Sequence, residues 1–259
     1  MDRFELYERT VQAPEHLIPF LIGIHGGSAR VLGEDFCATA LLSRSWALAL
    51  PEGQSVAIDI DRQMLARSGP APRVLLVEAD LRASLPEGLP RPDIVWVGNF
   101  SIGYLHERGE LVAYLARTRG RLASRGVFAC DTYGGGAAWR TGAAVREHFL
   151  PGGLRVRSTW EQRAADPVTA RVVNALHFRV DRDGDVVFEQ ADAFVYDWRV
   201  WSLPELADAA REAGFGACAV YAHLAHDPGG RQGRPSPLRD PRELGDPGER
   251  WAAVFAARV

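Results

Sequence analysis

Short, almost continuously apolar segments alternate with helical patterns through the first half of the chain. The clearest is 93–97, Asp-Ile-Val-Trp-Val, and similar strands are expected at 30–35, 55–60, 73–79 and 126–130. A strand that is apolar on both faces needs cover on both faces, as in a parallel sheet flanked by helices. Helical patterns at 39–48, 62–67 and 107–123 supply that cover. The order predicts an α/β fold with a doubly wound, mostly parallel, Rossmann-like sheet, whose ligands bind beyond the carboxyl ends of the strands.

The pattern changes after residue 150. Segments 154–162, 171–180 and 186–198 alternate apolar and polar residues and are joined by turn signals at Asp166-Pro167 and Asp183-Gly184. This alternation predicts an inserted antiparallel β cover over the carboxyl edge of the parallel sheet, with one buried face and one partly wet face. A helix at 203–213 and strands at 217–223 and 251–257 follow, separated by a loop at 227–250 that is expected to be mobile.

The chain is therefore divided into four predicted parts. They are N-terminal helices at 1–28, a Rossmann-like core at 29–150, the antiparallel β cover insertion at 151–201, and a C-terminal helix with the last strands of the core sheet at 202–259.

Composition excludes several classes of partner. A formal charge of −3, from 30 basic and 33 acidic residues, gives no basic footprint for nucleic acid. No apolar run is long enough to span a membrane, and the charged start argues against a signal peptide, so a cytoplasmic protein is expected. Cys37, Cys130 and Cys218 form no CxxC pair, and His223 and His226 have no further ligand nearby, so no metal is predicted. A homodimer is left open.

Three carboxylates follow three successive predicted strands. Glu34 opens the turn after the first strand, Asp59 ends the second strand and Asp80 follows the third. A carboxylate after the second strand can accept hydrogen bonds from both hydroxyls of a ribose. The one after the third strand lies where an adenine amino group would be. The helix that follows Glu34 offers unpaired N–H groups, so a nucleoside-containing ligand is expected at these strand ends.

This arrangement resembles the class I methyltransferases that use S-adenosyl-L-methionine (SAM), whose first loop usually reads Asp/Glu-x-Gly-x-Gly-x-Gly. Aligned on Glu34, the three glycines fall at Phe36, Ala38 and Ala40. The following segments are similar to a bacterial subgroup of these methyltransferases along nearly the whole chain: Glu-Asp-Phe-Cys-Ala-Thr-Ala-Leu-Leu from Glu34, Asn99-Phe100-Ser101, Asp131-Thr132-Tyr133-Gly134-Gly135, Trp160-Glu161-Gln162 and Tyr196-Asp197-Trp198-Arg199-Val200-Trp201.

The resemblance implies SAM as cofactor and assigns residues to it. The expected cofactor-binding residues are Glu34, Phe36, Cys37, Thr39, Asp59, Ile60, Asp80, Leu81, Asn99 and Phe100. Phe36 departs most from the pattern, because glycine normally supplies the close approach and the positive φ that this position needs. Tyr7 and Trp46 border the same region, but packing is expected for both.

The methyl acceptor is expected on the open side of the cofactor. Asn99, Ser101 and Tyr104 follow the fourth strand and are the expected catalytic residues, while Tyr133, Glu161, Tyr196 and Trp198 are expected to bind a small-molecule acceptor. Taken singly, each is also compatible with capping or core packing. Asp197 and Arg199 share a strand face and could form an ion pair.

The predicted reaction is an in-line transfer of the SAM methyl to an N, O or C nucleophile. A base is optional for such a reaction, and His106, Glu161 and His177 are the candidates. Two other functions stay open: a nicotinamide-dependent oxidoreductase, although no G-x-G-x-x-G follows the first strand, and a non-catalytic SAM-binding protein.

Overall fold

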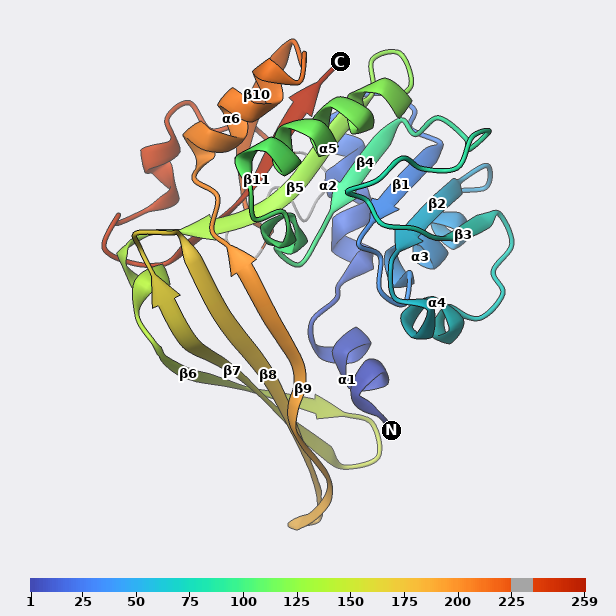
Figure 1. Ribbon diagram of the computed structural model, residues 1–259. Helices are drawn as coiled ribbons and strands as arrows, with labels where there is room; N and C mark the ends of the chain where they lie inside the picture. Colours follow the sequence, from blue (N-terminus) through green and yellow to red (C-terminus); the bar gives the residue numbers. More distant parts are fainter. Residues whose placement is uncertain (225–234) are drawn as a thin grey trace.

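The computed structural model describes residues 1–224 and 235–259, and its larger sheet has seven strands in the order β10-β11-β5-β4-β1-β2-β3 (Figure 1). The bounds are β1 Val31–Asp35, β2 Gln54–Asp59, β3 Val74–Glu78, β4 Ile94–Val97, β5 Val127–Gly134, β10 Ala217–Ala222 and β11 Trp251–Arg258. Pairs among β1 to β5 are parallel, and β11 runs antiparallel to both β5 and β10. The predicted doubly wound, mostly parallel sheet is confirmed.

Helices cover both faces of this sheet, as its apolar strands require. The helices and single-turn segments are α1 Arg3–Thr10, α2 Pro14–His25, α3 Leu41–Ala49, α4 Arg62–Ser68, η1 Ser101–Tyr104, α5 Arg108–Arg121, η2 Gly136–Trp139, α6 Leu203–Glu212 and η3 Pro241–Leu244. Side chains of β4 alternate between the two cores: Ile94 and Trp96 pack with α2 and α3, while Val95 and Val97 pack with α5 and α6.

The smaller sheet is the predicted antiparallel cover, with strand order β6-β7-β8-β9. Its strands are β6 Gly142–Leu150, β7 Leu154–Asp166, β8 Arg171–Arg182 and β9 Asp185–Arg199. The sheet begins at Gly142, ahead of the predicted insertion at 151–201. The sequence did not reveal β6 because it is an exposed edge strand, and an edge strand needs no alternating apolar face.

The cover is anchored to the core through η1 and α1. A Cβ atom added to Gly103 would lie 2.8 Å from Cβ of Trp198, so only glycine lets η1 approach β9 this closely. On the other side, Phe4 and Tyr7 of α1 pack their rings against Phe194 of β9, and Arg3 donates to the Ala193 carbonyl at 2.8 Å. In Figure 1, α1 accordingly lies between the cover and the core strands.

Part of the loop predicted at 227–250 lies outside the described residues, as does His226. Its described part contacts the core, since the Leu238 N–H donates to the Val220 carbonyl at 2.8 Å. It also contains η3, which begins with a capping box at Asp240.

Within 1–224 and 235–259, no helix is long and apolar enough to cross a membrane.

Candidate functional site

The carboxyl ends of β1, β2, β3 and β4 open into one large cavity of about 550 Å³. Strand order reverses between β1 and β4, which is where an open α/β sheet leaves a crevice for its ligand. The cover closes the cavity with Asp192 to Tyr196 of β9, and α1 adds Arg3, Phe4 and Tyr7 to the wall. The site therefore lies between the strand-end loops of the core sheet, strand β9 of the cover and helix α1, which are far apart in the sequence.

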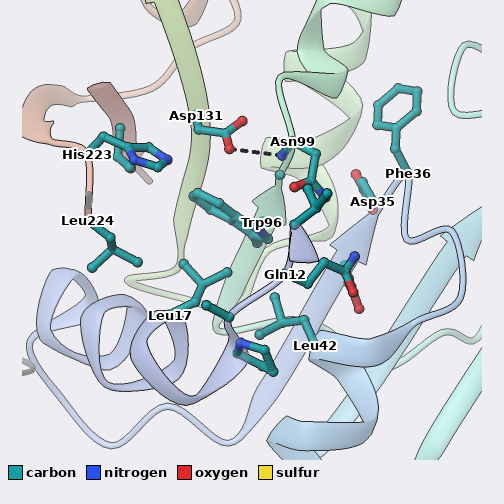
Figure 2. A pocket seen from close by; sticks show the side chains of 16 residues that line it. Gln12, Leu17, Asp35, Phe36, Leu42, Trp96, Asn99, Asp131, His223 and Leu224 are labelled. Carbon is teal, nitrogen blue, oxygen red and sulfur yellow. Dashed lines mark hydrogen bonds between the residues drawn. The ribbon is translucent and has the colours of Figure 1, made fainter. Parts of the chain in front are cut away.

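A small cavity of about 120 Å³ adjoins the large one, and Phe36 and Asn99 line both. Figure 2 shows Asp131 and Asn99 joined by a hydrogen bond, with Asp35 and Phe36 on the side opposite His223. Segment 11–14 and Leu17 of α2 form another part of the wall. The two cavities together are lined by residues at the ends of β1 to β5.

The loop after β1 has positive φ angles at the three positions where the related motif has glycine, although none of the three residues is glycine. Phe36, Ala38 and Ala40 have φ values of 55°, 50° and 54°, in the left-handed region that L-residues avoid at a cost of about 1–2 kcal/mol each. The Ala38 N–H donates to Asp59 Oδ2 at 2.8 Å, and the Cys37 N–H donates to the Ile58 carbonyl at 3.0 Å. The loop thus adopts the backbone that the aligned glycines would favour.

The loop after β4 carries two more residues in the left-handed region, Asn99 at φ 55° and Phe100 at φ 60°. Asp131 of β5 holds both, since its carboxylate accepts from Asn99 N–H at 2.9 Å and Phe100 N–H at 2.6 Å. Burial raises the pKa of Asp131 to about 7, although both amide bonds oppose the shift. Five left-handed residues in two neighbouring loops at the cavity make this edge of the sheet the candidate site.

The small cavity is rich in buried oxygen acceptors. Glu34 accepts from the Ser43 N–H at 2.8 Å, and burial raises its pKa to about 7. Asp35 accepts from the Tyr114 hydroxyl at 2.6 Å and pairs with Arg121, but its Oδ1 accepts no hydrogen bond among the described residues, and neither does Gln12 Oε1. The cavity therefore offers unpartnered acceptors to a ligand group that donates hydrogen bonds.

Asp59 and Asp80 both line the large cavity. Asp59 is half-buried and accepts from the amides of Ala38 and Asp61, at 2.8 and 2.9 Å. A carboxylate has roughly four lone-pair sites, so Asp59 can also accept from a ligand. Asp80 is held by Arg82 through a fork of bonds at 3.0 Å, and these bonds lower the pKa of Asp80.

Three tyrosines from three elements also line the large cavity: Tyr7 of α1, Tyr104 of η1 and Tyr196 of β9. Burial raises the pKa of each, that of Tyr104 to about 12, so all three phenols stay protonated near neutrality. The Tyr104 ring stacks on Phe36 at a centroid distance of 6.0 Å and meets the edge of Trp198 at 5.9 Å. The phenols offer neutral hydrogen bonds to a ligand.

Many residues selected from the sequence meet at these two cavities. They are Glu34, Phe36, Thr39, Asp59, Ile60, Asp80, Leu81, Asn99, Ser101, Tyr104 and Tyr196. Tyr7, for which packing was expected, lines the large cavity, whereas Trp46 is fully buried in the core.

Five other selected residues line neither cavity: Cys37, Phe100, Tyr133, Glu161 and Trp198. Cys37 is buried beneath the loop, and Phe100 packs in a cluster with Tyr133 and Trp198 at 4.9 and 6.2 Å. Trp198 lies directly behind Tyr104 and stacks on Tyr196 at 4.5 Å.

Glu161 points away from the site. Its neighbour Trp160 stacks on Tyr196, and successive side chains of a strand face opposite ways. Glu161 instead bonds Arg163 at 2.8 Å and His177 at 3.1 Å on the other face of the cover. The suggested ion pair between Asp197 and Arg199 is also wrong: Asp197 pairs with Arg171, and Arg199 pairs with Glu205.

The sequence reasoning missed Asp131 and Gln12. Asp131 is a buried residue of β5 and directly follows the apolar segment predicted at 126–130, and that position was the available signal for it. Gln12 lies between two helices, where nothing in the pattern marks it. Among the described residues, no cluster of three or more His, Cys, Asp or Glu side chains is placed to hold a metal ion.

No family model and no curated protein sequence matches the chain. Solved structures match along its whole length. DesVI of Streptomyces venezuelae has a TM-score of 0.70 at 18% identity, covering 98% of this chain and 95% of DesVI. SAM-bound CalS10, an amino pentose methyltransferase from Micromonospora echinaspora, scores 0.69 at 17% identity and covers 100% and 97%. The sugar N-methyltransferase KedS8 from Streptoalloteichus sp. scores 0.65 at 17%, covering 98% and 92%. The chain therefore has the same fold as DesVI and these two methyltransferases.

Proposed function

We propose that this chain is a SAM-dependent methyltransferase that moves the sulfonium methyl to an N, O or C nucleophile of a small molecule. The observation that carries the proposal is the backbone of the first loop, where Phe36, Ala38 and Ala40 all adopt positive φ beside the carboxylate of Asp59. Maintaining three strained residues has a cost, and a cofactor that approaches the backbone closely gives a reason for it.

The proposed cofactor would lie across the strand ends. The adenine would sit between Leu81 and Asp80, and the ribose hydroxyls would bond the open lone pairs of Asp59. The amino-acid end would pass Phe36 into the small cavity, where Glu34, Asp35 and Gln12 offer acceptors to an ammonium group. This layout uses both cavities and the two residues that they share.

The acceptor would enter from the cover side of the large cavity. SAM supplies an electrophilic methyl with a good leaving group, so the protein mainly aligns the acceptor and excludes water. Asn99, Ser101 and Tyr104 line the cavity beside the shared wall, and Tyr196 faces them from β9. Trp198 and Phe100 would act from behind, by holding Tyr104 and the β4 loop in place.

An amine-bearing sugar is the first acceptor class to test. CalS10 and KedS8, which share the fold, are an amino pentose methyltransferase and a sugar N-methyltransferase. The neutral phenols of Tyr7, Tyr104 and Tyr196 and the ring of Phe194 also suit a polar ring with an apolar face.

Calorimetry with SAM, S-adenosylhomocysteine and NAD tests the cofactor. We expect the first two to bind and NAD not to bind; the reverse result would favour a nicotinamide-dependent protein. Incubation with [methyl-³H]SAM and a small-molecule extract, or a set of amino sugars, then tests transfer. Binding of SAM without labelled product would indicate a non-catalytic SAM-binding protein.

A further inference from the structure

Methylation of an ammonium or hydroxyl acceptor releases one proton overall, and the large cavity contains few groups that could take it. Of the described residues that line it, His106 alone is a histidine. Imidazole is the side chain whose charge ordinarily changes between about pH 5 and 8. His106 follows η1, two positions after Tyr104, on the stretch proposed to face the acceptor.

The hydrogen bond that His106 makes defines its tautomer. Its Nε2 lies 2.8 Å from the backbone carbonyl oxygen of Asp197 in β9. A carbonyl can only accept, so Nε2 carries the hydrogen and donates it. In the neutral ring the lone pair is then on Nδ1, which is the nitrogen that can accept a proton. The carbonyl also stabilises the imidazolium that forms when Nδ1 takes a proton.

The other titratable groups near the large cavity are not suited to act as the general base, because each is already hydrogen-bonded, is too weak a base, or keeps its own proton. Asp59 accepts two backbone N–H bonds and is assigned to the ribose of the proposed cofactor, and Asp61 caps α4. Asp80 and Asp192 are held by arginines, whose hydrogen bonds lower their pKa values and make them weak bases. The tyrosines keep their protons, and Glu161 and His177 bond each other on the far face of the cover.

We propose that His106 is the general base of the reaction, held in its active tautomer by the cover strand β9; the proposal rests on the methyltransferase function proposed above. The lone pair of the acceptor N or O forms a bond to the methyl carbon, and the carbon–sulfur bond breaks with its electron pair remaining on sulfur. The acceptor proton passes to Nδ1 of His106. The products are the methylated acceptor, S-adenosylhomocysteine and a protonated imidazole, which later releases its proton to water.

The charged side chains around His106 form ion pairs or hydrogen bonds with residues other than His106. Arg199 of β9 donates to the His106 carbonyl at 3.0 Å and pairs with Glu205, while the Asp197 side chain pairs with Arg171. At the start of α5, Glu107 caps the helix and Arg108 pairs with Glu212. Tyr104 of η1 and the Asp80–Arg82 pair share the cavity wall. No unpaired carboxylate among these described groups competes with His106 for the proton.

The His106→Gln variant tests the proposal, with His177→Gln as the matched control. Glutamine retains an N–H that can reach the Asp197 carbonyl but has no titratable lone pair. Label transfer from [methyl-³H]SAM to the small-molecule extract is followed from roughly pH 5.5 to 8. We expect His106→Gln to lose about 100-fold or more in rate, and to lose the decline in rate at acid pH, with unchanged SAM affinity. His177→Gln should behave like wild type.

A second measurement does not need an acceptor. Long-range ¹H–¹⁵N correlation of the wild-type protein labelled at histidine nitrogens should show His106, assigned by comparison with the variant, in its Nε2–H form when neutral. An Nδ1–H form would overturn the proposal, as would a His106→Gln variant with the wild-type rate and pH profile. A wild-type protein that transfers no label would remove the methyltransferase proposal as well, so the two failures are distinguishable.

Discussion

Glu34 and Asp131 make the stability of the free protein depend on pH. In the folded chain their pKa values are about 7, against reference values of 4.5 and 3.8. Between about pH 5 and 7 the folded state therefore holds more protons than the unfolded state, so the free energy of unfolding falls as pH rises and flattens above that window. The limiting slope for one such group is about 1.4 kcal/mol per pH unit.

Urea unfolding across this range measures the effect. The Asp131→Asn variant should show a shallower fall than wild type because it removes one of the two groups. An equal slope in the two proteins would mean that Asp131 is not the titrating group.

Asp59 is predicted to contribute strongly to SAM binding. Replacing it with Ala removes the acceptor for the ribose and for the Ala38 amide. We expect a loss of about 1.5–3 kcal/mol in binding free energy, the range for hydrogen bonds to charged groups. Calorimetry with SAM measures it, and Asp166→Ala, which changes an exposed turn of the cover, serves as the control. An unchanged SAM affinity would remove Asp59 from the site.

At the scale of the element, the loop after β1 should tolerate glycine better than alanine. Ala38 has φ 50°, so Ala38→Gly relieves backbone strain, and we expect a gain of up to about 1 kcal/mol in the free energy of unfolding. Ala113→Gly, at an exposed position inside α5, should instead lose about 1 kcal/mol. Urea unfolding of the two variants tests this prediction. If both lost the same free energy of unfolding, Ala38 would not be in the left-handed region.

Tyr104 and Trp198 contact each other, but replacing each with alanine should change a different property, methyl transfer for Tyr104 and stability for Trp198. Tyr104 is 37% exposed and lines the cavity, so Tyr104→Ala should reduce methyl transfer far more than stability. Trp198 is 2% exposed and stacks on both Trp160 and Tyr196, so Trp198→Ala should lose about 3–5 kcal/mol of stability. Thermal unfolding and labelled-methyl assays on both variants measure the contrast. A stable Trp198→Ala protein with impaired transfer would make that tryptophan a pocket residue.

At the scale of the whole molecule, the sequence predicted the sheet well because its strands are marked by local apolar runs. Asp59, Asp80 and Tyr104 could be selected for the same reason, since each follows such a run or its loop. Glu161 could not be placed, because strand alternation does not reveal which face meets the cavity. The contributions of α1 and Gln12 depend on contacts between distant segments, which no local pattern encodes.

The insertion of the cover between β5 and β11 also affects the order in which the chain can assemble. Asp131 of β5 pairs in register with Val254 of β11, so their contact closes a loop that contains the whole cover, whereas β8 pairs with adjacent hairpin strands. Local pairings form faster than distant ones, because loop-closure entropy is lost before distant contacts compensate for it. Pulsed hydrogen exchange during refolding should therefore protect amides of β8 before those of β11. Simultaneous protection would show instead that both sheets form in one cooperative step.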